Sequence, residues 1–519
     1  MCHYCTCCAI DACPIRVAKK LENDPQLSVT APKLLLHLLT MAPAQSESRS
    51  LWTRIYDEIG LRTYIDTPYD VKILSVQRFV RLAAYGASTL VLVLYLVAQG
   101  NSIEKVGSFM TLTLLGDVLI SLVLTVIADK IGRKRMLALG SLLMTISGVI
   151  FACTSSFWAL LAASILGVIS PSGNEVGPFK AIEESTISQL SPSSDRSSVL
   201  AWYTLHGTAG AAMGAVICGW VIRVLQTDRG WEPLRAYRAV FAAYAVMGLV
   251  KFMLCLMLSS AVEIDAAPKE QDGERRPLLA DASEEQAPSP SRASKSNTFP
   301  PQLSRETLTL VCKLGFLFAM DSLASGLIPA AWLVFFFNRK FGLREEKLGS
   351  LFFVTNIVSS ASNLVSSSLA RRIGLVKTMV FTHAPSSIAL ALIPIPSNLA
   401  FAMVLLIIRA SISSMDQAPR QAFLAAAVLP TERTTVMGIV NVVKTLSQSI
   451  GPVITGRLAA SGKFWVVFVI AGCLKLAYDG LLLGMFLSYK TVEEKAQAIV
   501  TEEIEREREE GIDDSRDVA

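Results

Sequence analysis

The sequence predicts an all-α polytopic membrane protein with twelve transmembrane helices in two six-helix halves. Its 519 residues are 52% hydrophobic and 18% charged, and the mean hydropathy is +0.47. This is too apolar for an ordinary soluble protein. Twelve apolar stretches are long enough to span a bilayer. Parts of the first half also recur in the second, as is typical of secondary transporters.

The stretch 107–128 and the turn after it predict the orientation. About 22 mostly apolar residues at 1.5 Å per residue form a helix of ~33 Å, enough to cross a ~30 Å hydrocarbon core. The turn Asp129–Arg135 then carries four basic residues against one acid. Because short loops rich in Lys and Arg stay on the cytoplasmic side, we expect this turn in the cytoplasm.

The repeat appears when the chain is aligned with itself at shifts of 242 and 237 residues. Helix glycines and the charged turn then coincide, which chance similarity between apolar segments does not explain. The matched pairs are Gly107 with Gly349, residues 128–132 with 370–374, Gly214 with Gly451, and Gly219 with Gly456.

The remaining spans and their connections follow from the apolar stretches. The predicted spans are 79–98, 107–128, 136–154, 157–189, 198–222, 239–260, 309–337, 347–370, 376–396, 398–424, 433–459 and 463–488. The predicted organisation is a largely disordered cytoplasmic segment 1–75, a first half 76–260, a disordered cytoplasmic linker 261–305, a second half 306–490 and a charged cytoplasmic tail 491–519. An even number of spans places both termini in the cytoplasm.

A cysteine-rich stretch opens the chain, with Cys2, Cys5, Cys7, Cys8 and Cys13 close to His3. Zinc sites usually set two ligand pairs apart across a folded loop, and this cluster is too crowded for that pattern. Palmitoylation or an uncertain start codon explains it better. We therefore expect no metal and no cofactor.

The turn resembles the loop between helices two and three of the major facilitator superfamily, whose pattern here is Ala128, Asp129, Gly132, Arg133 and Lys134. The resemblance covers roughly residues 75–490 and implies that superfamily's fold. It also implies an inner gate at Asp129, Gly132, Arg133 and Lys134, which holds the cytoplasmic side shut while the cavity faces out. The fifth helix lacks the Gly-Pro pair of drug antiporters, and the fourth and tenth helices resemble a poorly characterised fungal and bacterial branch.

The fourth span is interrupted near mid-membrane by Pro171 and again by Pro178. Proline removes a backbone donor, so the freed carbonyls must face neighbours or a water-filled cavity. Glu175 near this break has a repeat counterpart in Asp416. A binding or hinge site and a simple packing kink explain the pattern equally well. Glu183, closer to the helix end, is assigned to the cytoplasmic rim.

Charges deep in the spans are candidates for a central cavity, because a central charge costs at least ~2.5–3.5 kcal/mol unless it faces a cavity or a partner. Structural ion pairs are the alternative for each, and for His206 the favoured one. Lys475 and Asp479 are four residues apart and are expected to neutralise one another. The candidate cavity residues are Asp117, Glu175, His206, Asp321, Arg409, Asp416 and Lys444. Two bases against one acid in the second half favour an anionic group on the substrate, and Asp117 is a candidate for a proton or a cationic group.

These features together predict transport of a small solute by alternating access, either secondary active, including proton-coupled, or facilitative. No G-x-x-x-x-G-K-[ST] or G-x-S-x-G motif occurs, which argues against an ATP motor and a hydrolase. The alternative from another class is a transport-inactive receptor or scaffold with the same fold. We expect a monomer in a lipid bilayer, either the plasma membrane or an internal membrane such as the vacuolar one, with no nucleic-acid partner. The substrate, the coupling ion and the direction are not encoded in any motif that we recognise.

Overall fold

The computed structural model describes residues 61–167, 169, 178–192, 195–263, 305–428 and 432–487. The chain forms two compact units, Met1–Arg62 and Thr63–Ala519, and the second is the subject below. All regular structure in the described residues is helical. The cysteine-rich stretch, the linker 264–304 and the tail from 488 lie outside these residues. Helix α5 begins at Tyr69, so the predicted boundary at residue 75 falls inside a helix.

Helices occupy all twelve predicted spans. The first half contains α5 (Tyr69–Ala98), α6 (Ile103–Ile131), α7 (Arg133–Cys153), α8 (Phe157–Leu166), α9 (Pro178–Leu190), α10 (Arg196–Arg223) and α11 (Pro233–Leu256). The short elements α4 (Leu61–Ile65), η1 (Val224–Asp228) and η2 (Ser260–Val262) flank them. The second half contains α12 (Arg305–Leu327), α13 (Ala330–Phe341), α14 (Glu345–Ile373), α15 (Leu375–Leu392), α16 (Leu399–Ser413), α17 (Gln417–Ala427), α18 (Arg433–Ala460) and α19 (Phe464–Phe486).

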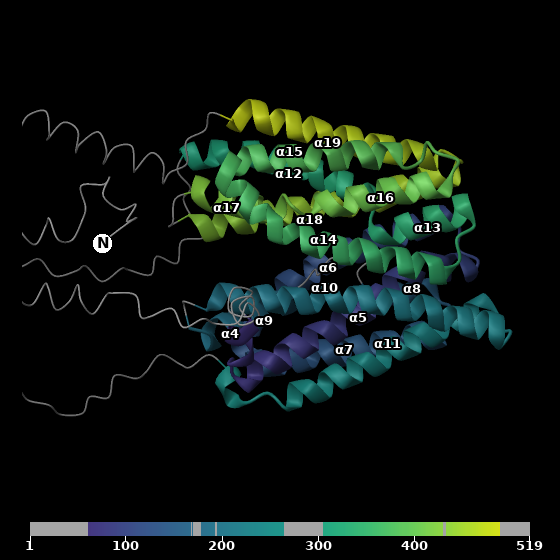
Figure 1. Cartoon of the computed structure of the whole chain (residues 1–519). Helices are drawn as coiled ribbons and strands as arrows, with labels where there is room; N and C mark the ends of the chain where they lie inside the picture. Colours follow the sequence, from purple (N-terminus) through teal and green to yellow (C-terminus); the bar gives the residue numbers. More distant parts are fainter. Residues whose placement is uncertain are drawn as a thin grey trace, which may run out of the picture. The chain divides into compact units, whose positions relative to one another are not determined.

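Seven helical segments of the described chain are long and apolar enough to cross a membrane, and α8 and α16 are shorter apolar helices. Many of their large apolar side chains face outward, such as Trp158, which is 72% exposed. Lipid offers the backbone no hydrogen-bond partner, so a helix, which satisfies these groups internally, is the structure such segments must adopt. Figure 1 shows α5–α11 grouped on one side of this unit and α12–α19 on the other.

Three spans are each built from two helices. Helix α8 ends at Leu166 and α9 begins at Pro178, while the predicted interruption at Pro171 lies outside the described residues; a break near Asp416 separates α16 from α17. The stretch 309–337, predicted as one helix, is also broken, because Pro329 lacks the N–H that would continue α12 into α13. The hydroxyl of Thr455 donates 2.5 Å to the freed carbonyl of Leu327.

The internal repeat is visible in the geometry. Helices α6 and α14 have 29 residues each, and each ends at a glycine with positive φ, 92° at Gly132 and 88° at Gly374. Helices α10 and α18 have 28 residues each. An L-residue rarely adopts such a φ, which explains why the turn keeps glycine in both halves.

The two halves touch through these repeated helices, α6 against α18 and α10 against α14. A Cβ on Gly107 would lie 2.6 Å from the Pro452 carbonyl oxygen, and one on Gly349 would lie 2.4 Å from that of Ala215. Both contacts lie far from the Asp129–Arg135 turn. We call the end that carries this turn the basic-turn end, and the other the opposite end. The close contacts of α6 with α18 at Gly107 and of α10 with α14 at Gly349 lie toward the opposite end.

Candidate functional site

A cavity of about 350 Å³ lies where the two halves meet. Helices α5 and α10 of the first half and seven helices of the second, together with the break between α12 and α13, form its wall. Its size is at the lower end of the range for small-molecule sites. We call this the central cavity.

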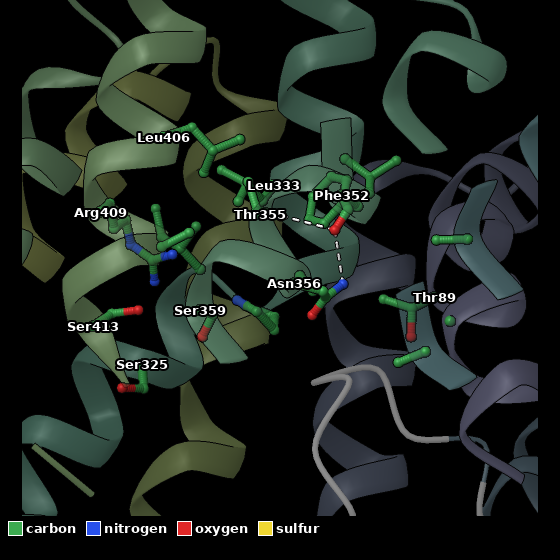
Figure 2. Close-up of a pocket in the computed structure, with 18 of the residues that line it drawn as sticks. Thr89, Ser325, Leu333, Phe352, Thr355, Asn356, Ser359, Leu406, Arg409 and Ser413 are labelled. Carbon is green, nitrogen blue, oxygen red and sulfur yellow. Dashed lines mark hydrogen bonds between the residues drawn. The ribbon is translucent and has the colours of Figure 1, made fainter. Parts of the chain in front are cut away.

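The polar part of the wall comes mainly from the second half. In Figure 2 the guanidinium of Arg409 extends from α16 into the cavity, on the same side as the hydroxyls of Ser325, Ser359 and Ser413. No hydrogen bond or ion pair to this guanidinium is found among the described residues. The backbone carbonyl of Arg409 accepts a hydrogen bond from the Ser386 hydroxyl at 3.3 Å. An unpaired guanidinium on a cavity wall is a ready ligand for an anion.

The part of the wall toward the opposite end is apolar. Figure 2 shows Leu333, Phe352 and Leu406 gathered there, with Thr89 of α5 facing them from the first half. Because Leu406 and Arg409 are three residues apart on α16, the apolar region and the guanidinium lie about one helical turn apart.

A network of buried charges supports this wall from behind. The Asp321 carboxylate accepts hydrogen bonds from Lys475 Nζ at 2.6 Å and from an Arg420 nitrogen at 2.9 Å, and Arg420 also pairs with Asp416. Lys475 Nζ donates a second bond to the Ser325 hydroxyl at 2.8 Å. Buried charges are stable only when paired in this way. Asp321 and Asp416 are therefore held by bases of their own half and are not among the cavity-lining residues.

His383 connects the network to Asp479. Its Nδ1 lies 2.9 Å from Asp479 Oδ1, and its Nε2 lies 3.4 Å from Lys475 Nζ. The same Nε2 lies 3.5 Å from Asp321 Oδ1, so His383 links Asp479 to the Asp321–Lys475 pair. Lys475 and Asp479 are thus bonded to residues of other helices, whereas their spacing had predicted a pair with each other.

Lys444 is the other predicted base of the second half. Its Nζ lies 5.9 Å from the centre of the Phe318 ring, it forms no ion pair with another described residue, and it does not line the cavity. Of the predicted cavity residues that the structure describes, Arg409 alone is among the lining residues. Arg420 and His383 were not identified from the sequence, and Lys475 was assigned to a pair with Asp479, although His383 and Lys475 line the cavity.

The first half contributes fewer of the predicted residues. Asp117 of α6 is fully buried, and neither of its carboxylate oxygens has a hydrogen-bond partner in the described part of the chain. The Nδ1–H of His206 donates a 2.8 Å bond to the Trp202 carbonyl, and its ring lies 5.3 Å from the Tyr64 ring at a tilt of 35°, away from the cavity. Glu175 lies outside the described residues.

Glu183, which the sequence places at the cytoplasmic rim, is fully buried among helices of the first half. Two Arg81 nitrogens donate to its carboxylate at 2.8 and 2.7 Å, and the Tyr203 hydroxyl donates at 2.5 Å. Lys251 Nζ lies 3.8 Å away. A bidentate Arg–carboxylate pair fixes both partners in orientation. These bonds fasten α9, which follows the break in the fourth span, to α5, α10 and α11.

The basic turn forms hydrogen bonds with other parts of the first half and with Glu263, which follows it. Gly132 provides the turn, and the Glu263 carboxylate accepts hydrogen bonds from the backbone N–H groups of Arg133 at 2.8 Å and Lys134 at 3.2 Å. A carboxylate at the N-terminus of α7 also interacts favourably with the helix dipole. The Lys134 side chain donates to the Leu256 carbonyl at 3.2 Å. The Asp129 side chain lies outside the described part, so its gate role stays a prediction.

No group of three metal-ligating side chains is found in the described residues. A helical bundle in two repeated halves, with a central cavity between them, is the architecture of a polytopic transporter. The comparison with families agrees: residues 74–320 and 314–510 each match the model of the Major Facilitator Superfamily. The chain therefore belongs to this superfamily.

Individual relatives are similar over most of the chain. An uncharacterized membrane protein of Saccharomyces cerevisiae, YJR124C, is 38% identical over 421 residues, which are 80% of this chain and 94% of the relative. Among solved structures, the nucleoside transporter NupG superposes with a TM-score of 0.59 at 14% identity, covering 82% of this chain and 100% of NupG. A D-xylose-proton symporter gives 0.59 at 12% identity, covering 80% and 97%. At these identities the structural matches establish the fold alone.

Proposed function

We propose that this protein moves a small solute across a membrane by alternating access of its two halves around the central cavity. Membership of the superfamily and the solute transporters among its structural neighbours support this function. The observation that carries the proposal is the position of the contacts between halves. They join α6 to α18 and α10 to α14 near the opposite end, and the cavity lies between the halves.

Alternating access requires that these contacts exchange for others at the basic-turn end. Close glycine contacts suit such an exchange, because at these crossings the halves meet backbone to backbone. With the basic turn in the cytoplasm, as proposed from its charge, the present arrangement corresponds to a transporter closed on the outer side. The energy would come from a gradient of the solute or of an ion.

The finer part of the proposal is an anionic group on the solute and a proton site in the first half. Arg409 supports the first, because its guanidinium lines the cavity and has no hydrogen-bond or ion-pair partner among the described residues. Asp117 is the candidate for the second, because among the described residues no hydrogen bond competes with a proton for its oxygens.

The test is a flux measurement with the purified full-length protein in sealed vesicles. Untargeted analysis of solutes taken up and released, with and without a pH gradient, should find at least one solute whose movement requires the protein. A pH gradient that accelerates this flux would support proton coupling. If protein that binds ligand moves none across any membrane composition tried, the receptor or scaffold alternative replaces the proposal.

A further inference from the structure

We propose that the central cavity binds an organic monoanion that has a short apolar chain and no amino group. This inference rests on the proposed function and names the substrate class of the same site. Three features of the cavity lead to it: its charge, the position of its apolar wall and its size.

The charge of the cavity favours one negative charge on the ligand. Among the described residues, Arg409, Lys475 and His383 line it and no Asp or Glu does. Lys475 is engaged by Asp321 at 2.6 Å and by Ser325, and His383 by Asp479. Arg409 alone offers an unused charge, and its planar fork matches a carboxylate.

The same set of charged lining residues disfavours zwitterions and cations as ligands. An ammonium group entering the cavity would lose its water and would find no carboxylate on the wall to replace it. Such uncompensated burial of a charge is strongly unfavourable. A neutral ligand would leave Arg409 without a counter-charge when the cavity closes. An amine-free anion avoids both penalties.

The apolar wall orients the ligand. Leu333, Phe352 and Leu406 lie toward the opposite end from Arg409, about one helical turn away. A ligand with its carboxylate at Arg409 therefore places a short hydrocarbon chain against these side chains. A volume of about 350 Å³, at the lower end of the range for small-molecule sites, admits a small organic acid.

The test measures binding by the purified full-length protein in detergent, separately from transport. The probes are butanoate, butanamide and 2-aminobutanoate, which share a four-carbon skeleton and differ in charge. We expect butanoate to raise the unfolding temperature saturably, and the amide and the zwitterion to bind at least tenfold more weakly. Arg409→Gln should weaken butanoate binding tenfold or more, and Arg409→Lys, which keeps the charge but not the fork, should give an intermediate loss.

Lys444→Gln separates a cavity charge from a charge elsewhere in the same half, because Lys444 forms no ion pair with another described residue and does not line the cavity. It should keep butanoate binding within about twofold. Equal binding of all three probes, no saturable binding of butanoate, or a loss in Lys444→Gln as large as in Arg409→Gln would overturn the proposal. Butanoate that binds through Arg409 but is not transported would leave this inference standing and count against alternating access instead.

Discussion

The hydroxyl of Tyr237 donates a 2.5 Å hydrogen bond to the Glu345 carboxylate, and this buried contact joins α11 of the first half to the beginning of α14 in the second. An ion pair of 3.1 Å between Arg223 and Glu346 lies in the next position along α14. The backbone at Gly219 also packs directly against Glu345. Together these contacts form a latch at the opposite end, defined by Arg223, Tyr237, Glu345 and Glu346.

Breaking the latch should favour the state that is open at the opposite end. A hydrogen bond to a charged group contributes about 1.5–3 kcal/mol, so Tyr237→Phe should shift the balance of the two states by roughly ten- to a hundredfold. Thr89→Cys on the cavity wall reports the shift through its rate of labelling by a membrane-impermeant thiol reagent, in a background without native cysteines. The rate of labelling by reagent added on the side of the opposite end should rise. Tyr69→Phe is the matched control, because Tyr69 is 59% exposed, and equal rates in both variants would show that the latch does not hold the halves.

The glycine crossing between α6 and α18 should be sensitive to a single methyl group. In Gly107→Ala the new Cβ would lie 2.6 Å from the Pro452 carbonyl oxygen and 2.9 Å from the Gly456 Cα, which neither backbone can avoid without moving. We expect the halves to separate at this end, with faster Thr89→Cys labelling from the opposite side and slower flux. Gly480→Ala is the control, because nothing lies within 4 Å of its added Cβ. Native flux and labelling in Gly107→Ala would contradict the close contact.

The sequence predicts depth along the helices well and rotation about them poorly. The correspondence between α6 and α14 could be predicted from the sequence, because glycines and a charged turn recur at one spacing. Lys475 and Asp479 share a helix face, yet they bond to Asp321, 154 residues from Lys475, and to His383, 96 residues from Asp479. Which neighbour a face meets depends on how the helices pack, which no local pattern encodes. The same limit explains why the partners of Glu183 were not predicted, because Arg81, which donates to its carboxylate, is 102 residues away.

Asp321 should be needed chiefly for stability. Asp321→Asn leaves Lys475 and Arg420 buried without their shared carboxylate, and removal of one partner of a buried pair costs about 3–5 kcal/mol. The yield of folded protein and its unfolding temperature should both fall. Removing Lys475 as well, in Asp321→Asn with Lys475→Met, should recover much of the loss, since coupled residues are not additive. The double variant Asp321→Asn with Lys444→Gln should recover little of the lost stability. Recovery in that variant, and not in the one with Lys475→Met, would mean that Lys444 is the true partner of Asp321.

The segment 261–305 should be cytoplasmic. An even number of spans and the basic turn at 129–135 both place it on that side. A protease added to sealed membrane vesicles of known orientation should cut this segment only when the cytoplasmic face is outward, or after permeabilisation. Cleavage in vesicles with the non-cytoplasmic face outward would overturn the orientation, and with it the assignment of inner and outer sides to the two ends.

Asp129 should act in the state that is closed at the basic-turn end. The superfamily resemblance assigns Asp129 and Arg133 to that closure, and α18 begins near this end at Arg433, where helix amides favour a nearby carboxylate. In the present structure the Arg133 amide is bonded instead to Glu263, which follows the first half. Asp129→Asn should therefore weaken the closed state, raise Thr89→Cys labelling from the basic-turn side and slow transport, with ligand binding largely kept.

The matched control for this variant is Asp66→Asn, an exposed acid just before α5. Labelling must be compared from both sides, because a gate at the basic-turn end predicts faster labelling from that side and slower labelling from the other. Unfolding of the protein would instead raise both rates together. If Asp129→Asn transports at the native rate with labelling equal to that of Asp66→Asn, the closure depends on other residues of the turn, and Asp129 has no part in the gate.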